Sequence, residues 1–144
     1  MDGVLNCAAT FQDKANRVDD RYFLDPAMVA RLDRVLAATG ATVIVSSCWR
    51  RGDNGRYLRQ VLERAGLVHF DRIVDETPII GASRGAEIHA YLATRTELPD
   101  RIAIVDDDDD FGYLRDHLAR TTWAAGLTDD VADLLIEALG RIPL

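Results

Sequence analysis

The most constraining feature of this sequence is an apolar run, residues 101–106 (RIAIVD), that passes directly into four more aspartates at 107–110. Short runs rich in branched side chains are typical of strands buried in a parallel sheet. Residues 41–47 (ATVIVSS) have the same form and end in two serines. Because ligands of such sheets bind at the carboxyl ends of the strands, both runs place polar side chains where a ligand site would form.

Segments with helical periodicity separate the expected strands. Within residues 27–39, Val29, Leu32 and Leu36 recur on one face. An Asp-Pro pair before this segment favours a helix start, and a glycine after it favours a helix end. Alternating strands and helices predict an α/β fold with a parallel sheet between helical layers. The other expected elements are helices at 57–65, 84–93, 113–118 and 129–139 and weaker strands at 72–74 and 121–124.

Length and charge limit the classes of function. With 144 residues, we expect a single domain spanning residues 1–144. The 17 basic and 24 acidic side chains give a net charge of −7, which opposes nonspecific binding to nucleic acid or anionic membranes. No apolar stretch approaches the ~18 residues of a membrane span, and no secretory leader opens the sequence. Cys7 and Cys48 are too few for a disulfide framework, so we expect a cytoplasmic protein.

Residues 6–25 form the longest stretch without a clear period. We expect a surface loop or small flap here, inserted into the domain. This segment is too short to form a large lid, so an open site with a minimal cap, or none, is expected.

Polar residues follow apolar runs at three places: Asp2 near the start, Ser46 after the second run, and the aspartates at 106–110. Closely packed carboxylates repel one another, and a divalent cation relieves that repulsion. Oxygen ligands without histidine or cysteine partners suit Mg²⁺, which also binds phosphate. A phosphate would bind a serine hydroxyl and a guanidinium, and Arg84 is a candidate for the second group. Together these groups are the parts of a phosphoryl-transfer site.

The motifs DGVLN, SSCWR, RGAEI and DDDDD occur in that order along the chain. In this order they resemble the haloacid dehalogenase (HAD) superfamily of phosphohydrolases, and in particular the small HAD domains related to Swiss Army Knife RNA-repair proteins. The resemblance extends over nearly the whole chain, up to Gly126–Thr128. It implies a three-layer, Rossmann-like parallel sheet and Mg²⁺-dependent hydrolysis of phosphomonoesters through an aspartyl-phosphate.

The resemblance also implies roles for individual residues. Asp2 matches the second aspartate of the family's Asp-x-Asp-Gly motif, which is the general acid/base. Ser46 matches the phosphate-binding serine, and Arg84 takes the cationic role usually given to lysine. The implied Mg²⁺ ligands are Asp2, Asp106 and Asp107, and the implied substrate contacts are Ser47 and Arg50.

One position departs from the family pattern. Met1 occupies the middle of Asp-x-Asp, so the nucleophilic aspartate and the central strand before it would both lie upstream of Met1. We therefore hypothesise a natural start several residues upstream, with an apolar strand that ends in Asp. In one alternative, a HAD-like domain without the nucleophile binds metal, phosphate or a partner without turnover. In another, a second chain supplies the missing strand.

The candidate residues also have structural interpretations. The two serines, Ser46 and Ser47, would suit a turn, Arg84 would pair with Glu87, and Arg50 would brace its own loop. The aspartate run would then be a solvated patch, and Trp49 is expected in the core or as a loop anchor.

The substrate that the resemblance implies is a small phosphorylated molecule. A nucleic-acid end also fits an open site, but the net charge of −7 gives it no support. The sequence does not indicate an oligomeric state.

Overall fold

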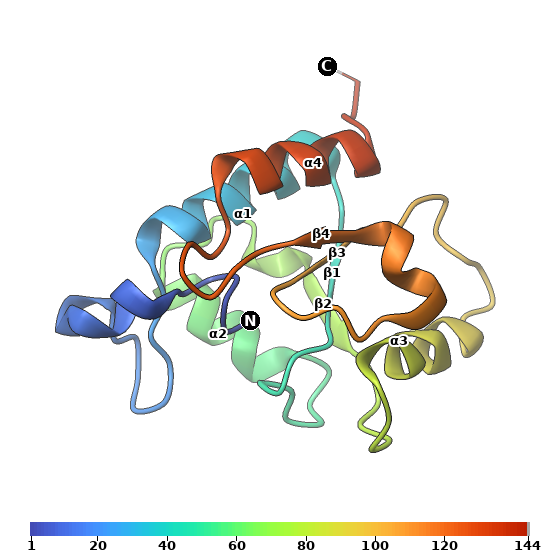
Figure 1. The fold of residues 1–144 in the computed structure, drawn as a ribbon, viewed down its shortest axis with the longest axis horizontal. Coiled ribbons are helices and arrows are strands. Elements are labelled where there is room, and N and C mark those ends of the chain that lie inside the picture. Colours follow the sequence, from blue (N-terminus) through green and yellow to red (C-terminus); the bar gives the residue numbers. More distant parts are fainter. Residues whose placement is uncertain (144) are drawn as a thin grey trace.

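Four short strands lie between two pairs of helices in the computed structural model, which describes residues 1–143 (Figure 1). Helices α1 and α4 lie on one side of the strands, and α2 and α3 lie on the other. The helices are α1 (Pro26–Thr39), α2 (Arg56–Arg64), α3 (Arg84–Ala93) and α4 (Asp129–Leu139). The strands are β1 (Val43–Val45), β2 (Ile73–Glu76), β3 (Ile104–Asp106) and β4 (Leu118–Arg120). Short 3₁₀ helices cover Ala8–Gln12, Lys14–Asn16, Phe70–Arg72 and Gly112–His117.

The strands pair in parallel, β1 with β2 and β3 with β4. In the first pair Val45 lies opposite Glu76, and in the second Asp106 lies opposite Arg120. The predicted α/β class with parallel strands is therefore confirmed. A single continuous sheet is not formed within residues 1–143, because the two pairs remain separate.

Strands β1 and β3 each have one edge without a strand partner among the described residues. No backbone hydrogen bond joins them in that part of the chain. Val43 on β1 and Val105 on β3 are only half-buried, whereas central strands of an α/β sheet are normally covered on both faces.

Residues 1–5 form a turn that lies near the centre of the molecule (Figure 1). The backbone N–H groups of Val4 and Leu5 both donate to the Met1 carbonyl, at 3.0 Å. The Thr121 hydroxyl donates to the Gly3 carbonyl at 2.5 Å, and the Leu127 N–H donates to the Val4 carbonyl at 2.8 Å. The start of the chain is thus fixed to the segment that follows β4.

Helices α1 and α4 pack together over the main hydrophobic core. The Asp25 side chain accepts a hydrogen bond from the Ala27 N–H at 2.9 Å and caps α1, as the Asp-Pro pair predicts. The apolar face of α1 is buried as the periodicity predicts. The buried core residues of the two helices are Met28, Val29, Leu32, Val35, Leu36, Ala132, Leu135 and Ile136.

The flap, residues 6–25, contains two 3₁₀ turns and an antiparallel bridge between Arg17 and Phe23. Its buried side is held by Tyr22, whose ring centroid lies 4.7 Å from Trp49 and 6.3 Å from Tyr57. The flap therefore packs on the loop between β1 and α2.

One strand prediction was wrong in position. The strand expected at 121–124 lies instead at Leu118–Arg120, and the residues after it form a turn closed by a bridge between Thr122 and Gly126. The reason is tertiary, because the Thr121 side chain bonds to Gly3 at the opposite end of the sequence. Within residues 1–143, every helix is too short or too polar to span a bilayer.

The beginning of α3 packs closely on the end of the aspartate run. The Gly85 N–H donates to the Asp110 carbonyl at 3.1 Å, and a Cβ at Gly85 would lie 2.3 Å from the Phe111 carbonyl oxygen. We therefore expect Gly85→Ala to lower the free energy of unfolding by about 2 kcal/mol, because overpacking against backbone outweighs the helix propensity of alanine.

Urea unfolding of the two proteins measures this difference. The matched control is Gly81→Ala. Gly81 has a φ of +71°, but an added Cβ would meet no atom within 4 Å, so only backbone strain of about 1 kcal/mol is expected. A Gly85→Ala protein that is more stable than the natural sequence would contradict the close approach.

Candidate functional site

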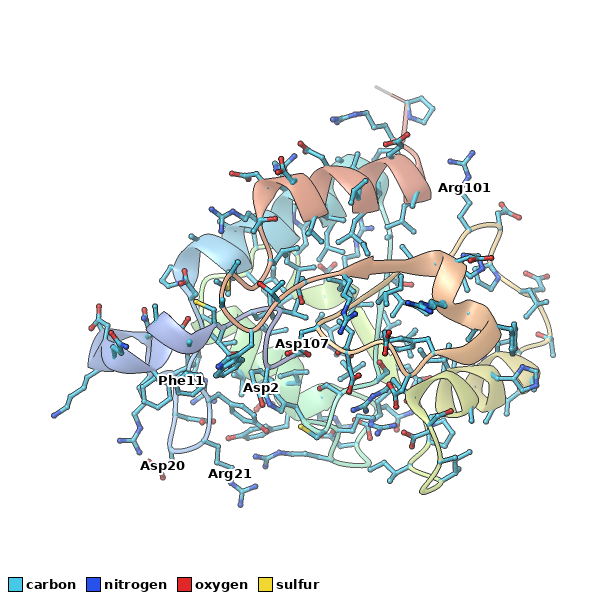
Figure 2. The ribbon with its side chains drawn as sticks, in the orientation of Figure 1. Asp2, Phe11, Asp20, Arg21, Arg101 and Asp107 are labelled. Carbon is cyan, nitrogen blue, oxygen red and sulfur yellow. The ribbon has the colours of Figure 1, made fainter. Side chains whose placement is uncertain are left out.

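Three segments from distant parts of the chain meet at the carboxyl ends of the strands. Asp2 and Gly3 lie against the end of β3, where a Cβ at Gly3 would fall 2.2 Å from Oδ2 of Asp107. Since Gly3 also has a φ of +73°, only glycine fits between Asp2 and this carboxylate. In Figure 2, Asp2 and Asp107 lie side by side in the middle of the molecule. The structure thus brings together the first and last of the predicted polar segments.

The amino group of Met1 is buried in the same place. Burial lowers its pKa below the ordinary value of 8.0, while the negative charges of Asp106 and Asp2 act in the opposite direction. The guanidinium of Arg84 is also close enough to lower this pKa. The Met1 nitrogen therefore lies in a buried position among the predicted site residues.

Asp2 is exposed, but both of its carboxylate oxygens are hydrogen bonded. The Asn6 amide donates to Oδ1 at 2.9 Å, and the Trp49 indole N–H donates to Oδ2 at 3.3 Å. Trp49 is buried, which confirms its prediction as a loop anchor. These two donors hold the Asp2 carboxylate in one orientation while leaving it accessible to solvent, as a general acid/base requires.

Asn6 is a buried partner of Asp2 that the sequence analysis did not identify. It is fully buried, and its side-chain oxygen accepts from the Gly3 N–H at 3.0 Å. Its amide donates to Asp2 and also to the Phe23 carbonyl, at 3.0 Å. The only signal in the sequence is a polar residue directly after an apolar pair, Val4-Leu5, which also suits an ordinary strand end.

Asp106 and Asp107 are in mutual contact at the end of β3. Burial raises the pKa of Asp107 above its ordinary value, and the hydrogen bond and negative charge of Asp106 raise it further. Asp106 also accepts a hydrogen bond from the Asp108 N–H at 3.0 Å, which forms a tight turn. A divalent cation would stabilise two carboxylates that lie in contact with each other.

The other aspartates of the run have structural partners. Asp109 lies 3.4 Å from Arg115 and 3.6 Å from Arg120. Asp110 accepts a hydrogen bond from the Arg84 N–H through its carboxylate at 3.1 Å and so supports the start of α3. Asp108 is exposed. Asp110 is exposed like Asp108, so the interpretation of the run as a solvated patch fits this end of it, although Asp109 and Asp110 also have partners.

The serines after β1 differ from one another. The buried Ser47 hydroxyl accepts a hydrogen bond from the Trp49 N–H at 3.1 Å. This contact agrees with the interpretation of Ser47 as a turn residue. Ser46 is half-buried, and its hydroxyl has no hydrogen-bond partner among residues 1–143. Of the two serines, Ser46 therefore has the side chain that is available to a ligand.

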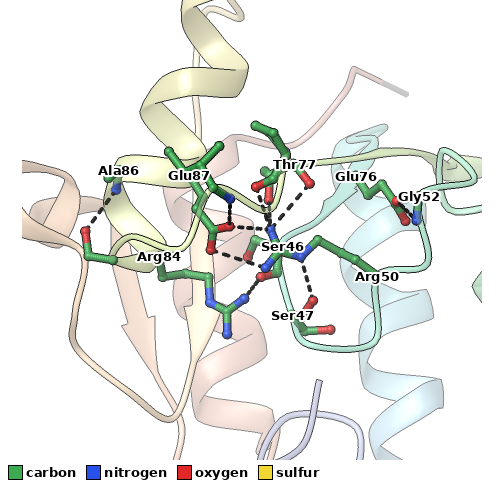
Figure 3. A network of polar contacts seen from close by, with 12 residues as sticks. Ser46, Ser47, Arg50, Gly52, Glu76, Thr77, Arg84, Ala86 and Glu87 are labelled. Atoms are coloured by element: carbon green, nitrogen blue, oxygen red, sulfur yellow. Dashed lines mark hydrogen bonds and ion pairs between the residues drawn. The ribbon is translucent and has the colours of Figure 1, made fainter.

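Arg84 lies beside Ser46. Its guanidinium donates to the Ser46 carbonyl, as Figure 3 shows. The pairing with Glu87 that the structural interpretation expected is wrong, because Glu87 is instead paired with Arg50. Arg84 has no ion-pair partner within the described range, and it lies near the Met1 nitrogen, as Asp2 and Asp106 do.

Arg50 forms the most extensive side-chain network of this region (Figure 3). Its two terminal nitrogens each lie 3.2 Å from a Glu87 oxygen, and both side chains are only 5% exposed. The same guanidinium donates to the Ser47 carbonyl at 2.8 Å and to the Thr77 hydroxyl at 2.7 Å. This geometry favours the bracing role of Arg50, and substrate contact by Arg50 stays a prediction.

The residues at this site fit a bound metal ion only in part. The oxygen chemistry of Asp106 and Asp107 suits Mg²⁺. Within residues 1–143, however, no group of three or more histidine, cysteine, aspartate or glutamate side chains is arranged to hold a metal ion. Asp2 is turned toward Asn6 and Trp49 rather than completing such a group.

Comparison with known proteins gives one match. A family model described as the HAD domain in Swiss Army Knife RNA repair proteins matches residues 1–132. No curated protein and no solved structure matches the chain. The matched range includes every site residue described above.

The Arg50–Glu87 pair allows a test of what holds the site together. Burial raises the pKa of Glu87, but hydrogen bonds from Arg50 and from the Ile80 N–H lower it more, so the net pKa lies below the ordinary 4.5. Removing one partner of a buried pair is costly, so we expect Glu87→Gln to lower the free energy of unfolding by about 3 kcal/mol at pH 7.

The pH dependence has a defined sign. The stabilisation from ionised Glu87 is present above about pH 4.5 and is lost as the pH falls through the lower folded-state pKa. The difference between natural and Glu87→Gln proteins in urea unfolding should therefore narrow below that pH. The control is Asp133→Asn, which breaks an exposed pair with Arg34 and should cost less than about 1 kcal/mol. A difference that stays constant with pH would contradict the role of this ion pair.

Proposed function

This chain belongs to the family of HAD domains in Swiss Army Knife RNA repair proteins, and from that premise we propose that it is a Mg²⁺-dependent phosphomonoester hydrolase. The observation that carries the proposal is the meeting of Asp2, Asp107 and Arg84 around one buried position, the Met1 nitrogen. Transfer of a phosphoryl group to water needs carboxylates that act as acid/base and bind a metal ion, and a guanidinium beside them. The expected compartment remains the cytoplasm.

The nucleophile in this proposal is an aspartate at the end of a strand upstream of Met1. Two features support such a strand: the unpaired edges of β1 and β3, and the burial of the Met1 nitrogen, through which the chain would continue. Inserted in parallel between β1 and β3, it would join both pairs into one sheet with helices on two sides. This sheet is the three-layer, Rossmann-like arrangement that the family resemblance implies.

The chemistry then has two steps. A carboxylate oxygen of the upstream aspartate attacks phosphorus and the bond to the leaving oxygen breaks, while protonated Asp2 gives its proton to that oxygen. Asp2, now ionised, takes a proton from water while the water oxygen attacks phosphorus. The bond between phosphorus and the aspartate oxygen breaks, which releases inorganic phosphate and restores the aspartate carboxylate. Arg84 and the Ser46 hydroxyl hold the phosphoryl oxygens.

Asp106 and Asp107 would hold Mg²⁺, with Asp2 as the third ligand that the family resemblance implies. When bound, the ion supplies positive charge that offsets the charge of the phosphoryl group. The raised pKa of Asp107 supports this assignment, because two adjacent carboxylates are costly to ionise together without a cation.

A small phosphorylated molecule is the expected substrate. The family description names RNA repair proteins, which adds the phosphorylated end of a nucleic acid as a candidate. The net charge of −7 does not favour binding along a nucleic-acid backbone, so recognition would be confined to the terminal phosphate and its neighbours.

Binding without turnover is the second candidate function. It is favoured by the hydrogen bond from Arg84 to the Ser46 carbonyl, which occupies part of the guanidinium that hydrolysis would need. In that case the domain would hold a metal ion or phosphate and release no product.

Metal binding can be tested without activity. We expect Mg²⁺ at about one hundred times its dissociation constant to raise the melting temperature of the natural chain by roughly 5–10 °C. Asp107→Asn should abolish this rise, because it removes one of the two adjacent carboxylates. Asp108→Asn is the matched control, since Asp108 is exposed and should leave the rise unchanged. An equal rise in all three proteins would exclude a metal site at Asp107.

The nucleophile is tested by comparing two versions of the protein. The first begins at Met1, and the second adds an apolar strand ending in Asp directly before Met1. Only the extended version should release phosphate from an aryl phosphate, and Asp107→Asn in that version should remove the activity. The extended version should also unfold at a higher temperature than the version without the added strand, because that strand pairs the open edges of β1 and β3. Activity of the version that begins at Met1 would show that another residue is the nucleophile, and inactivity of both versions would favour binding without turnover.

A further inference from the structure

Three aromatic side chains meet where the flap approaches the loop after β4. The ring centroid of Phe11 lies 5.1 Å from that of Phe23 and 5.7 Å from that of Trp123. Phe11 is 42% exposed and Trp123 is 45% exposed, although both are large and apolar. We refer to Phe11, Phe23 and Trp123 as the aromatic platform.

The flap has buried contacts besides these rings. Tyr22 is buried and packs on Trp49 and Tyr57. The platform is instead fixed by backbone, because the Ala8 N–H donates to the Trp123 carbonyl at 3.0 Å. The rings are thus held in place while part of their surface remains open to solvent.

The platform adjoins the proposed acid/base. One side chain, Asn6, donates hydrogen bonds both to the Asp2 carboxylate and to the Phe23 carbonyl. On the other side, Thr121 bonds to the Gly3 carbonyl two residues before Trp123. In the view of Figure 2, Phe11 lies on the side of Asp2 away from Asp107.

We propose that the aromatic platform binds a planar ring in the leaving group of the phosphate ester, as in a nucleoside monophosphate. This inference rests on the proposed function, because Asp2 marks the position of the leaving oxygen. A ring stacked on Phe11 or Trp123 would cover their exposed faces, and aromatic rings favour such stacked or tilted contacts. The platform therefore selects esters with an aromatic leaving group over aliphatic ones.

The size of the platform favours this occupant over a protein partner. A stable protein interface uses about 20–30 residues on each side, whereas three partly exposed rings match the area of a single planar group. Stacking also needs no positive charge, which agrees with a chain whose net charge is −7.

The first test measures binding of adenosine monophosphate and of ribose 5-phosphate, which has the same phosphate and sugar but no base. Calorimetry on the natural chain should give about tenfold tighter binding of adenosine monophosphate, the loss expected for one stacked ring. Phe11→Leu and Trp123→Leu keep an apolar side chain but remove the ring, and should make the two affinities equal. The matched control is Tyr113→Leu, because Tyr113 is 70% exposed on a separate 3₁₀ helix and should not change the ratio.

The outcomes separate this inference from the proposed function. If adenosine monophosphate binds selectively in a way that depends on Phe11, but the extended version releases no phosphate, the platform is supported and the proposed hydrolysis is contradicted. Equal affinity for both compounds, no binding of either, or selectivity that survives in both Leu variants would overturn the platform. A short RNA with a terminal phosphate, tested alongside, distinguishes two sources of the ring. Phe11-dependent binding of the RNA that is tighter than binding of the mononucleotide identifies a nucleic-acid end as the ligand. Equal binding of the two identifies a free nucleotide.

Discussion

The buried ion pair between Arg50 and Glu87 is the interaction on which the geometry of the site depends. It joins the loop after β1 to the segment after β2 and to the first turn of α3. Because both charges are almost fully buried, neither can leave the pair without a large loss of solvation energy. Ser46 and Arg84 are close together because the loop and the helix that carry them are held by this pair.

A second set of contacts brings in the start of the chain. Asn6 and Thr121 bind Gly3, and Gly3 in turn leaves room for Asp107. These contacts connect the two strand pairs through side chains and loops, although no strand pairing joins them within the described residues. The same arrangement sets the Asp2 carboxylate between the aspartates of β3 and the aromatic platform.

Much of this fold could be predicted from local patterns. Helices α1, α3 and α4 begin and end close to the predicted residues, because their caps and apolar spacing are local properties of the sequence. The strand after the 3₁₀ helix at Gly112–His117 was misplaced by a few residues, because Thr121 is held by Gly3 and not by its neighbours. The family resemblance, confirmed over residues 1–132, identified the segments that meet at the site.

The sequence alone determined the α/β class, the polar ends of the strands and the family, since each depends on residue order and spacing. Only the tertiary structure decided which polar side chains are free and which are occupied. Arg50 and Glu87 are 37 positions apart, and Asp2 and Trp49 are 47 apart, so no local pattern shows that they pair. The aromatic platform has the same origin, because Phe11 and Trp123 become neighbours only when the flap and the loop after β4 pack together.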